Sequence, residues 1–343
     1  MPSFIQVFDK GAERILGTDP KLDLLLEDKE CPFAHEAGVY IPGDNSLFIT
    51  SNQYPHPIAG TPHIHISRIQ LPLGVDSKEV QCTRVESDNV PMPNGGVNYK
   101  EGVLFCAQGT LDEPGGIFYM PLSSVRRNPL DTSSDAYEAR LLVSSFHGRS
   151  FNSPNDVAVH SDGSIWFTDP IYGWEQGIRP SPRLPNQVYR YDPATGGIRA
   201  IADSFGRPNG ICFSPDETIV YITDTEWIHG DGGTDDTRAS SIYAVDIATY
   251  SGQPFLINRR LFAMADTGIP DGIKCDMHGN VYSGCGDGLN IWSPGGVLLA
   301  KVLVGGGVAN FCFGKGGQVF LLNEHRLWRL QLAKGCNGAL LGL

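Results

Sequence analysis

Two stretches of this chain, NDVAVHSDGSIWFTD (155–169) and NGICFSPDETIVYITD (209–224), are copies of one pattern. Each begins with an asparagine, continues as a short alternating stretch, passes a turn rich in Asp, Gly or Pro, and ends in a second apolar stretch. Alternation bounded by turn residues is typical of a β-hairpin. The pattern therefore predicts the same hairpin at two places, which is an internal repeat.

Four further stretches fit the pattern, the two nearest the N-terminus more weakly. They are EAGVYIPGDNSLFITSN (36–52), GGVNYKEGVLFCAQG (95–109), DGIKCDMHGNVYSG (271–284) and ANFCFGKGGQVFLLN (309–323). The six copies begin 59, 60, 54, 62 and 38 residues apart. Four-stranded propeller blades repeat every roughly 40–50 residues, so this period favours blades. Stretches between the copies, such as QVYRYDPATGGIRAIA (187–202), alternate as outer strands do.

The repeat predicts an all-β fold, a six-bladed β-propeller with four-stranded blades around a central channel. The last blade has only HRLWRLQL (325–332) as an outer strand, so the N-terminal segment before Glu36 should supply the missing strand and close the ring. No linker interrupts the repeats, and residues 1–343 are therefore predicted to form a single domain. Gly (41) and Pro (24) make up about 19% of the chain, against a usual sum of roughly 12%, and serve as turn residues.

Charge and composition exclude several classes of partner. The net charge is −12 and no basic run is present, which argues against nucleic acid. The N-terminal stretch lacks the apolar core of a signal peptide, and no apolar run approaches the ~20 residues that span a bilayer. We expect a cytoplasmic protein without a membrane partner, as a monomer or a small homo-oligomer. The eight cysteines form no CxxC pair, and a disulfide between Cys31 and Cys336 is left open.

The first residue of each hairpin enters an innermost strand, so the six openings should meet at one end of the channel. They are Glu36, Asn94 or Gly95, Asn155, Asn209, Asp271, and Ala309 with Asn310. Strand formation does not account for them, because Asn and Asp are depleted in strands. Singly, each asparagine could instead bond its own backbone in a turn. Two carboxylates and two carboxamides together suit a hard divalent cation, Ca²⁺ before Mg²⁺ or Mn²⁺.

Three stretches closely resemble the regucalcin/gluconolactonase family of six-bladed propellers. They are NSPNDVAVHSDGSIWFTDPIYG (152–173), RPNGICFSPDETIVYITDT (207–225) and IPDGIKCDMHGNVYSG (269–284). The resemblance runs from about residue 36 to 330 and implies one divalent ion, usually calcium, in the channel. The family's ligand positions match Glu36, Asn155, Asn209 and Asp271. Known members hydrolyse lactones, and some hydrolyse phosphotriesters.

The resemblance implies a metal-dependent hydrolase that opens a small-molecule lactone or related ester. Its cofactor would be Ca²⁺, with Mg²⁺, Mn²⁺ or Zn²⁺ as alternatives. Such a cation polarises the carbonyl and lowers the pKa of bound water, and a carboxylate accepts the proton of the attacking water. By resemblance Asp271 is the catalytic base and Glu36 the second candidate. The alternative is a propeller of this family redirected to a non-hydrolytic biosynthetic step or to ligand binding. The chain has no GxSxG elbow, which argues against a serine hydrolase.

Three residues are candidates for substrate binding. Asn155 lies at the cation site, and His147 stands just before the SPND stretch, within reach of the pocket mouth. Tyr172 belongs to one of four long polar inserts expected to decorate a face of the propeller. The inserts are 53–68, 111–140, 170–186 and 226–240.

Two features beside the expected ligands bear on specificity and chemistry. Sugar-lactone members often carry a basic residue near the asparagine that matches Asn155, where this chain has NSP (152–154). The difference favours a less polar lactone or ester over gluconolactone. His35 is adjacent to Glu36, and its participation is left open because neighbouring strand residues point to opposite faces.

Overall fold

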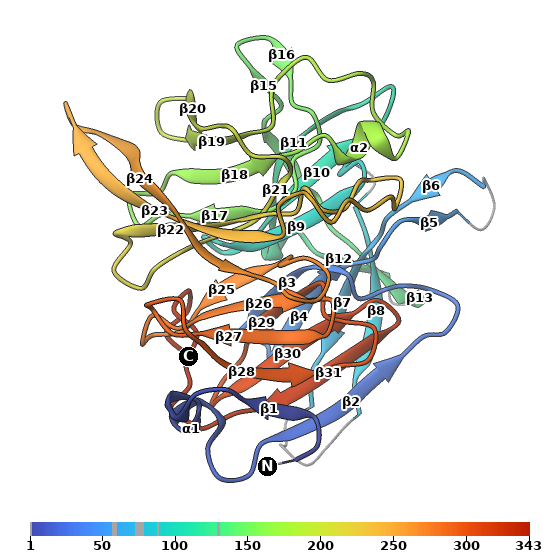
Figure 1. Cartoon of the computed structure of the whole chain (residues 1–343). Helices are drawn as coiled ribbons and strands as arrows, with labels where there is room; N and C mark the ends of the chain where they lie inside the picture. Colours follow the sequence, from blue (N-terminus) through green and yellow to red (C-terminus); the bar gives the residue numbers. More distant parts are fainter. Residues whose placement is uncertain (1, 57–59, 73–78, 88, 129–130) are drawn as a thin grey trace.

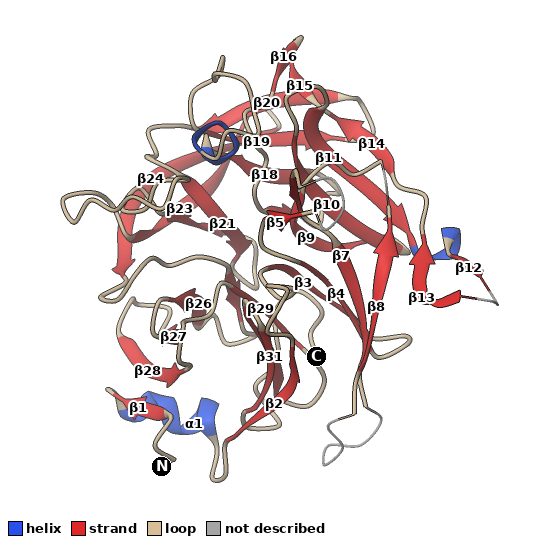
Figure 2. Ribbon diagram, turned by 90° about the vertical axis from the view of Figure 1, so that its right-hand side faces the viewer, coloured by secondary structure: helices blue, strands red, loops and turns tan. Residues whose placement is uncertain are grey.

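Six sheets of four or more strands surround a common centre, which confirms the predicted β-propeller (Figure 2). The structure is a computed structural model that describes residues 2–56, 60–72, 79–87, 89–128 and 131–343. In Figure 1 the propeller is seen from the side, with its inner strands running across the view. Helix is confined, in the described ranges, to the single turns α1 (Glu13–Leu16) and α2 (Tyr172–Glu175) and two short 3₁₀ turns.

The blades are numbered in chain order and described from the innermost strand outward. Blade 1 consists of β3 (Glu36–Ile41), β4 (Ser46–Thr50), β7 (Ile66–Gln70) and β8 (Gln81–Glu86). Blade 2 consists of β9 (Pro93–Tyr99), β10 (Gly102–Gly109), β11 (Pro114–Pro121) and β14 (Arg140–Val143). Blade 3 consists of β17 (Val157–Val159), β18 (Ile165–Asp169), β19 (Gln187–Asp192) and β20 (Gly197–Ala202).

The second half of the ring repeats this order. Blade 4 consists of β21 (Pro208–Phe213), β22 (Ile219–Asp224), β23 (Ser241–Tyr250) and β24 (Gln253–Met264). Blade 5 consists of β25 (Ile273–Cys275), β26 (Val281–Cys285), β27 (Gly288–Trp292) and β28 (Leu298–Leu303). Blade 6 contains β29 (Asn310–Phe313), β30 (Gln318–Asn323) and β31 (Arg326–Gln331) from the C-terminal part of the chain. All six predicted hairpins are therefore the two inner strands of a blade.

The N-terminal segment closes the ring as predicted. Strand β2 (Lys21–Glu27) pairs antiparallel with β31 and is the fourth strand of blade 6. The sequence did not predict that β1 (Ile5–Val7) would add a fifth strand to blade 5 by pairing with β28. The N-terminal segment is thus paired with both blade 5 and blade 6 before the chain enters blade 1.

A cluster of buried apolar side chains lies between every pair of neighbouring blades. Phe48 of blade 1 and Phe105 of blade 2 belong to one cluster, and Leu47 of blade 1 packs with Phe320 of blade 6 in another. Because blades cover both faces of their neighbours, β4 and β18 are buried at every residue. The outer strand β8 keeps an alternation of exposed and buried residues. The core is therefore six interfaces rather than one centre.

The inserts lie at the margins of the blades. Strands β5 (Tyr54–Pro55) and β6 (Pro62–His63) form a small hairpin, and β15 (Ser145–Phe146) pairs with β16 (Arg149–Ser150) in another. Strand β13 (Asp131–Ala136) pairs parallel with β8, and β12 (Arg126–Asn128) pairs antiparallel with β13 on its outer side. An insert from blade 2 therefore extends the sheet of blade 1. Parts of two predicted inserts, 57–59 and 129–130, lie outside the described residues.

Two further findings concern the cysteines and the membrane. All eight cysteines are free thiols, so Cys31 and Cys336 form no disulfide in this structure. Among the described residues no helix is both long enough and apolar enough to cross a membrane.

Candidate functional site

The six openings are joined to one another by hydrogen bonds across the blade boundaries. In three blades a threonine hydroxyl of the second strand donates to the backbone carbonyl of the next opening residue. These bonds run from Thr50 to Asn94 (3.0 Å), from Thr168 to Asn209 (2.6 Å) and from Thr223 to Asp271 (3.1 Å). Each threonine thereby fixes the backbone of the neighbouring blade at the residue whose side chain was predicted to face the channel.

Three other hydrogen bonds complete the circle. They run from Gly95 N to Asn155 O (2.8 Å), from Gly272 N to Ala309 O (2.9 Å), and from Asn310 Nδ2 to Glu36 Oε2 (2.6 Å). Six bonds therefore connect blade 1 to blade 2 and onward until blade 6 returns to blade 1. The predicted opening residues surround one end of the channel because each is held directly to its neighbour.

Glycine after the opening residue permits this close approach. A Cβ on Gly210 would lie 2.5 Å from the carbonyl oxygen of Asp271, and a Cβ on Gly272 would lie 2.4 Å from Cγ of Asn310. A real Cβ atom essentially never lies this close to another heavy atom. The N-G and D-G pairs at the openings are thus steric requirements of a narrow channel.

The backbone departs from regular strand geometry where the polar side chains stand. Ala37 and Gly38 both have a φ of 68°, and the pairing of β3 with β4 shifts its register between Glu36 and Val39. A similar shift between Pro208 and Ile211 surrounds Asn209 in blade 4. Bulges re-aim individual side chains out of the regular alternation. A buried carboxylate and carboxamide can therefore face the channel from strands whose other side chains pack in the core.

Asn310 fixes the orientation of Glu36. Its Oδ1 accepts from Phe311 N (2.8 Å) and from Lys274 Nζ (3.4 Å), which leaves Nδ2 to donate to the Glu36 carboxylate. Burial raises the pKa of Glu36, while the His35 charge and the Asn310 hydrogen bond oppose that rise. The Asn310 side chain is fully buried, so it holds one carboxylate oxygen of Glu36 in a defined place.

Asp271 is the second acid at this end of the channel. Burial raises its pKa well above the usual range of a carboxyl, and the Glu36 carboxylate raises it further. The His35 charge and a hydrogen bond from the Asn209 side chain act in the opposite direction. A buried acid whose pKa is raised by burial and again by a neighbouring carboxylate indicates a site that a bound positive charge would stabilise.

Three oxygen atoms at this end have no hydrogen-bond partner in the described part of the chain: Asn155 Oδ1, Asn209 Oδ1 and Asp271 Oδ1. A buried polar atom without a partner is unfavourable unless a ligand satisfies it. These oxygens, with the Glu36 carboxylate, form a set of two carboxylates and two amides that fits a hard divalent cation in charge and in ligand type. No cluster of three or more His, Cys, Asp or Glu suited to a metal occurs among the described residues, so a cation here would need the amide oxygens.

Two buried aspartates support the loops that carry the asparagines. Asp169 Oδ2 accepts from Asn152 N (2.9 Å) and its Oδ1 from Ser153 N (2.8 Å), and Asp224 accepts in the same way from the N–H groups of residues 206 and 207. The threonine–aspartate pair that ends both repeat copies thus has two functions. The threonine ties the next blade, and the aspartate shapes the turn before the asparagine of its own blade.

Tyr172 and His147 differ in their relation to this site. Tyr172 begins α2, is buried, and shares a hydrogen bond with the Thr225 hydroxyl. Burial raises the pKa of its phenol, and the Asp271 charge contributes, so Tyr172 lies within electrostatic reach of that acid. His147 is exposed in the turn between β15 and β16, where its ring contacts Phe146. No described contact brings His147 to the channel residues.

A pair that the sequence reasoning did not assign lies beside the two acids. His35 Nδ1 is 2.7 Å from Glu324 Oε1, and Asn52 Nδ2 donates to Glu324 Oε2 (3.0 Å). Burial lowers the pKa of His35, but the Glu324 carboxylate outweighs it and brings the pKa to about 10. The resulting imidazolium lies near Glu36. The adjacency of His35 to Glu36 in HEAG was the only sequence signal, and Glu324 had none, because 289 residues separate the partners.

Comparisons with known proteins agree with this architecture. The family model SMP-30/Gluconolactonase/LRE-like region matches residues 97–321. Lactonohydrolase oryL of Aspergillus oryzae is 28% identical over 320 residues, which are 88% of this chain and 68% of that protein. Gluconolactonase of Zymomonas mobilis is 30% identical over 204 residues, 56% of this chain and about half (53%) of that protein. A solved gluconolactonase structure from Xanthomonas campestris superposes with a TM-score of 0.73 at 25% identity, covering 96% of this chain and 94% of its own.

Proposed function

The chain belongs to the SMP-30/gluconolactonase/LRE-like family, and on that premise we propose that it hydrolyses a lactone at a divalent cation in the propeller channel. Relatives named lactonohydrolase and gluconolactonase support lactone opening as the reaction. The cation is proposed from three buried oxygens, on Asn155, Asn209 and Asp271, that have no hydrogen-bond partner within the described ranges and lie beside the Glu36 carboxylate. Oxygen-only donors favour Ca²⁺ over the softer transition metals.

The proposed chemistry assigns each residue a task. A bound divalent cation supplies Lewis-acid polarisation of the carbonyl. Asp271 accepts a proton from the water that attacks the carbonyl carbon, and it returns that proton to the ring oxygen when the carbon–oxygen bond breaks. Glu36, held by Asn310, is the second candidate for the base.

Substrate contacts are proposed for Asn155 and Tyr172. The buried ring of Tyr172 supplies an apolar wall close to Asp271, and its hydroxyl is engaged by Thr225. The NSP residues 152–154 present no basic side chain to a sugar hydroxyl or carboxylate, so a less polar lactone is the proposed substrate. A role for His147 stays a prediction that His147→Ala would test by a rise in KM.

The test combines cation removal with a panel of lactones. Protein treated with a chelator and then dialysed should lose lactone hydrolysis, and activity should return on adding Ca²⁺, with Mg²⁺, Mn²⁺ and Zn²⁺ compared at equal concentration. The panel runs from sugar lactones to aliphatic and aromatic lactones, and the less polar members should give the higher kcat/KM. Equal activity before and after chelation would refute the cation mechanism.

The same panel distinguishes hydrolysis from the alternative, a propeller redirected to a non-hydrolytic step or to binding. Wild-type protein that binds lactones by calorimetry but yields no hydroxy acid would favour the alternative. Intact turnover in both Asp271→Asn and Asn209→Ala would exclude this site as the catalyst. Asn290→Ala is the matched control, because Asn290 is also buried yet lies on β27, the third strand of blade 5.

A further inference from the structure

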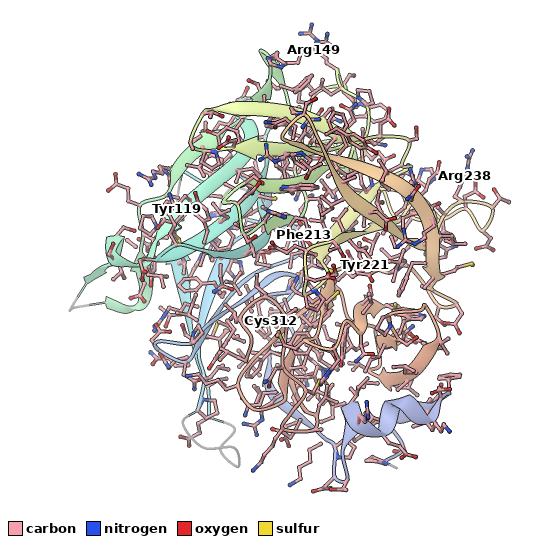
Figure 3. All side chains as sticks on the ribbon, turned by 90° about the vertical axis from the view of Figure 1, so that its left-hand side faces the viewer. Tyr119, Arg149, Phe213, Tyr221, Arg238 and Cys312 are labelled. Carbon is pink, nitrogen blue, oxygen red and sulfur yellow. The ribbon has the colours of Figure 1, made fainter. Side chains whose placement is uncertain are left out.

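A cavity of about 440 Å³ occupies the end of the channel opposite the proposed cation site. All six innermost strands contribute to its wall, among them Tyr40 of blade 1, Val97 of blade 2 and Phe313 of blade 6. Phe213 and Cys312, which also line it, lie near the middle of the face shown in Figure 3. Pockets that hold small ligands have volumes of about 300–1,000 Å³ and mostly apolar walls. The cavity has the size and lining of a small-molecule site.

The C-terminal segment 338–343 completes the wall. Ala339 N donates to Cys275 O (2.8 Å) of blade 5, and Gly338 packs so closely on Phe313 that a Cβ there would lie 2.6 Å from its ring. Leu341 and Leu343 pack against the cluster between blades 6 and 1. The segment is therefore docked on blades 5 and 6 and forms part of the cavity wall.

Lys274 gives the cavity a positive inner end. Its side chain lines the cavity, and its Nζ donates to Asn310 Oδ1 at 3.4 Å. No carboxylate lies within ion-pair distance of Lys274 in the described ranges. Burial raises the pKa of Asp156 and of Glu36, and the Lys274 charge lowers both, so the lysine also acts on two buried acids near the cation site. Both oxygens of Asp156 already accept backbone N–H groups, from Val157 (2.9 Å) and Ile211 (3.1 Å).

The other charged residues of the lining form no ion pair with Lys274 in the described ranges. Lys100 is exposed at the mouth, where its ammonium lies over the Tyr99 ring. Glu217 is the acid of the lining, and it accepts hydrogen bonds from Ser161, with His160 Nε2 3.5 Å from its carboxylate. An anion inside the cavity would therefore meet a lysine without an ion pair and no uncommitted carboxylate among the lining residues.

We propose that this cavity is a second ligand site, one that binds a small apolar carboxylate with its head group against Lys274 and its hydrocarbon part against the aromatic and aliphatic walls. Charge complementarity with Lys274 selects a carboxylate, since the walls alone would accept any apolar molecule. A hydrogen bond between a charged donor and a charged acceptor is stronger than one to a neutral hydroxyl. The carboxylate should bind at least about tenfold more tightly than the alcohol of equal length, a difference of about 1.4 kcal/mol.

The test uses octanoate and octan-1-ol as probes of the full-length protein in isothermal titration calorimetry, with a chelator present so that the proposed cation site cannot bind the acid. Wild type should prefer octanoate by about tenfold or more. Lys274→Met should remove the preference and Lys274→Arg should keep it. Lys100→Met, which changes the other lysine of the same lining, is the matched control and should keep it as well.

Three results would overturn the proposal: equal affinity for acid and alcohol in wild type, a preference that survives Lys274→Met, or a preference lost in Lys100→Met. If a variant does not fold, the comparison of octanoate with octan-1-ol on wild type still tests the proposal. Octanoate should slow alkylation of the cavity cysteines Cys212, Cys275 and Cys312 but not of the exposed Cys82, and equal rates would also overturn it. Because binding is measured without cation or turnover, its failure would leave the proposed lactonase function untouched.

Discussion

The two ends of the channel are built by the same six strands and differ sharply in chemistry. At one end Asn155, Asn209 and Asp271 present oxygens that have no hydrogen-bond partner among the described residues, and at the other Phe213 and Phe313 line a mostly apolar cavity. Within the strands alternation directs side chains into the clusters between blades. The polar residues instead stand at bulges or in the residues just before a strand. Departures from regular strand geometry, rather than strand composition, thus decide which end can bind a cation.

The difference also concerns how charge is balanced. At the cation end burial raises the pKa of both Glu36 and Asp271, the Glu36 carboxylate raises that of Asp271 further, and His35 is paired with Glu324. The apolar end has a lysine without an ion pair in the described ranges. Single substitutions can therefore separate the contribution of the channel oxygens to catalysis from that of the residues that hold those oxygens in place.

The largest expected effect is a loss of turnover on replacing Asp271, at the end of the channel proposed to bind the cation. Asp271→Asn keeps the shape of the side chain but removes the proposed base and half of the carboxylate charge. Loss of a general base lowers turnover by about 10²–10⁴-fold. Steady-state kinetics on a lactone that the wild type hydrolyses would measure this loss of turnover. Asp203→Asn, at an exposed aspartate, should change nothing. Unchanged turnover in Asp271→Asn would remove the proposed role of this end of the channel in catalysis.

A smaller effect is expected from the support behind Glu36. Asn310→Ala removes the hydrogen bond to Glu36 Oε2 and leaves the carboxylate free to reorient. Loss of a residue that orients a metal ligand weakens affinity by about 10–100-fold. Calcium titration calorimetry of chelated protein measures this directly, with Asn290→Ala as the buried-asparagine control. If Ca²⁺ affinity is the same in Asn310→Ala and wild type, Glu36 is not positioned in this way.

The smallest effect is expected from Asp169, which supports the loop before Asn155. Burial raises the pKa of Asp169 to about 7, although two backbone N–H groups oppose the rise. A carboxyl with a higher pKa in the folded state binds more protons when folded. Its contribution to stability is therefore present below the unfolded value of 3.8 and lost as pH rises through about 7.

Urea unfolding at steps between pH about 4 and about 7 measures this contribution against Asp169→Asn, which cannot ionise. The free energy of unfolding of wild type relative to the variant should fall across the window, because burial penalises the ionised carboxyl; the two backbone N–H groups, which favour the ionised form, reduce this fall. A difference that does not change with pH, or that grows as pH rises, would contradict a raised pKa for Asp169 in the folded protein.

Much of the fold could be predicted because the hairpin repeat is local. The copies at 155–169 and 209–224 predict both inner strands of their blades, and the short last blade predicts closure by the N-terminal segment. The fifth strand β1 could not be predicted, since its three residues carry no repeat. The parallel pairing of β13 with β8 joins parts of the chain that no local pattern connects.

The site divides in the same way. Glu36, Asn155, Asn209 and Asp271 could be named from their equivalent positions in the repeat, and their catalytic and metal-binding roles stay predictions. Tyr172 lies near Asp271 as an insert residue could, whereas His147 lies exposed in the turn of a separate hairpin. The length of an insert does not indicate which of its side chains faces the channel, because the path of a loop depends on contacts with distant parts of the chain.

The sequence by itself determined the propeller, the number of its blades and the polar residues that open each inner hairpin, because all three follow from a short-range repeat. Only the tertiary structure decided that six hydrogen bonds join those openings into one circle, that Asn310 turns its amide to Glu36, and that Glu324 meets His35. It also decided that Lys274 faces an apolar cavity at the far end. Each of these contacts joins residues of different blades, and such neighbours are set by closure of the ring rather than by any stretch of the chain.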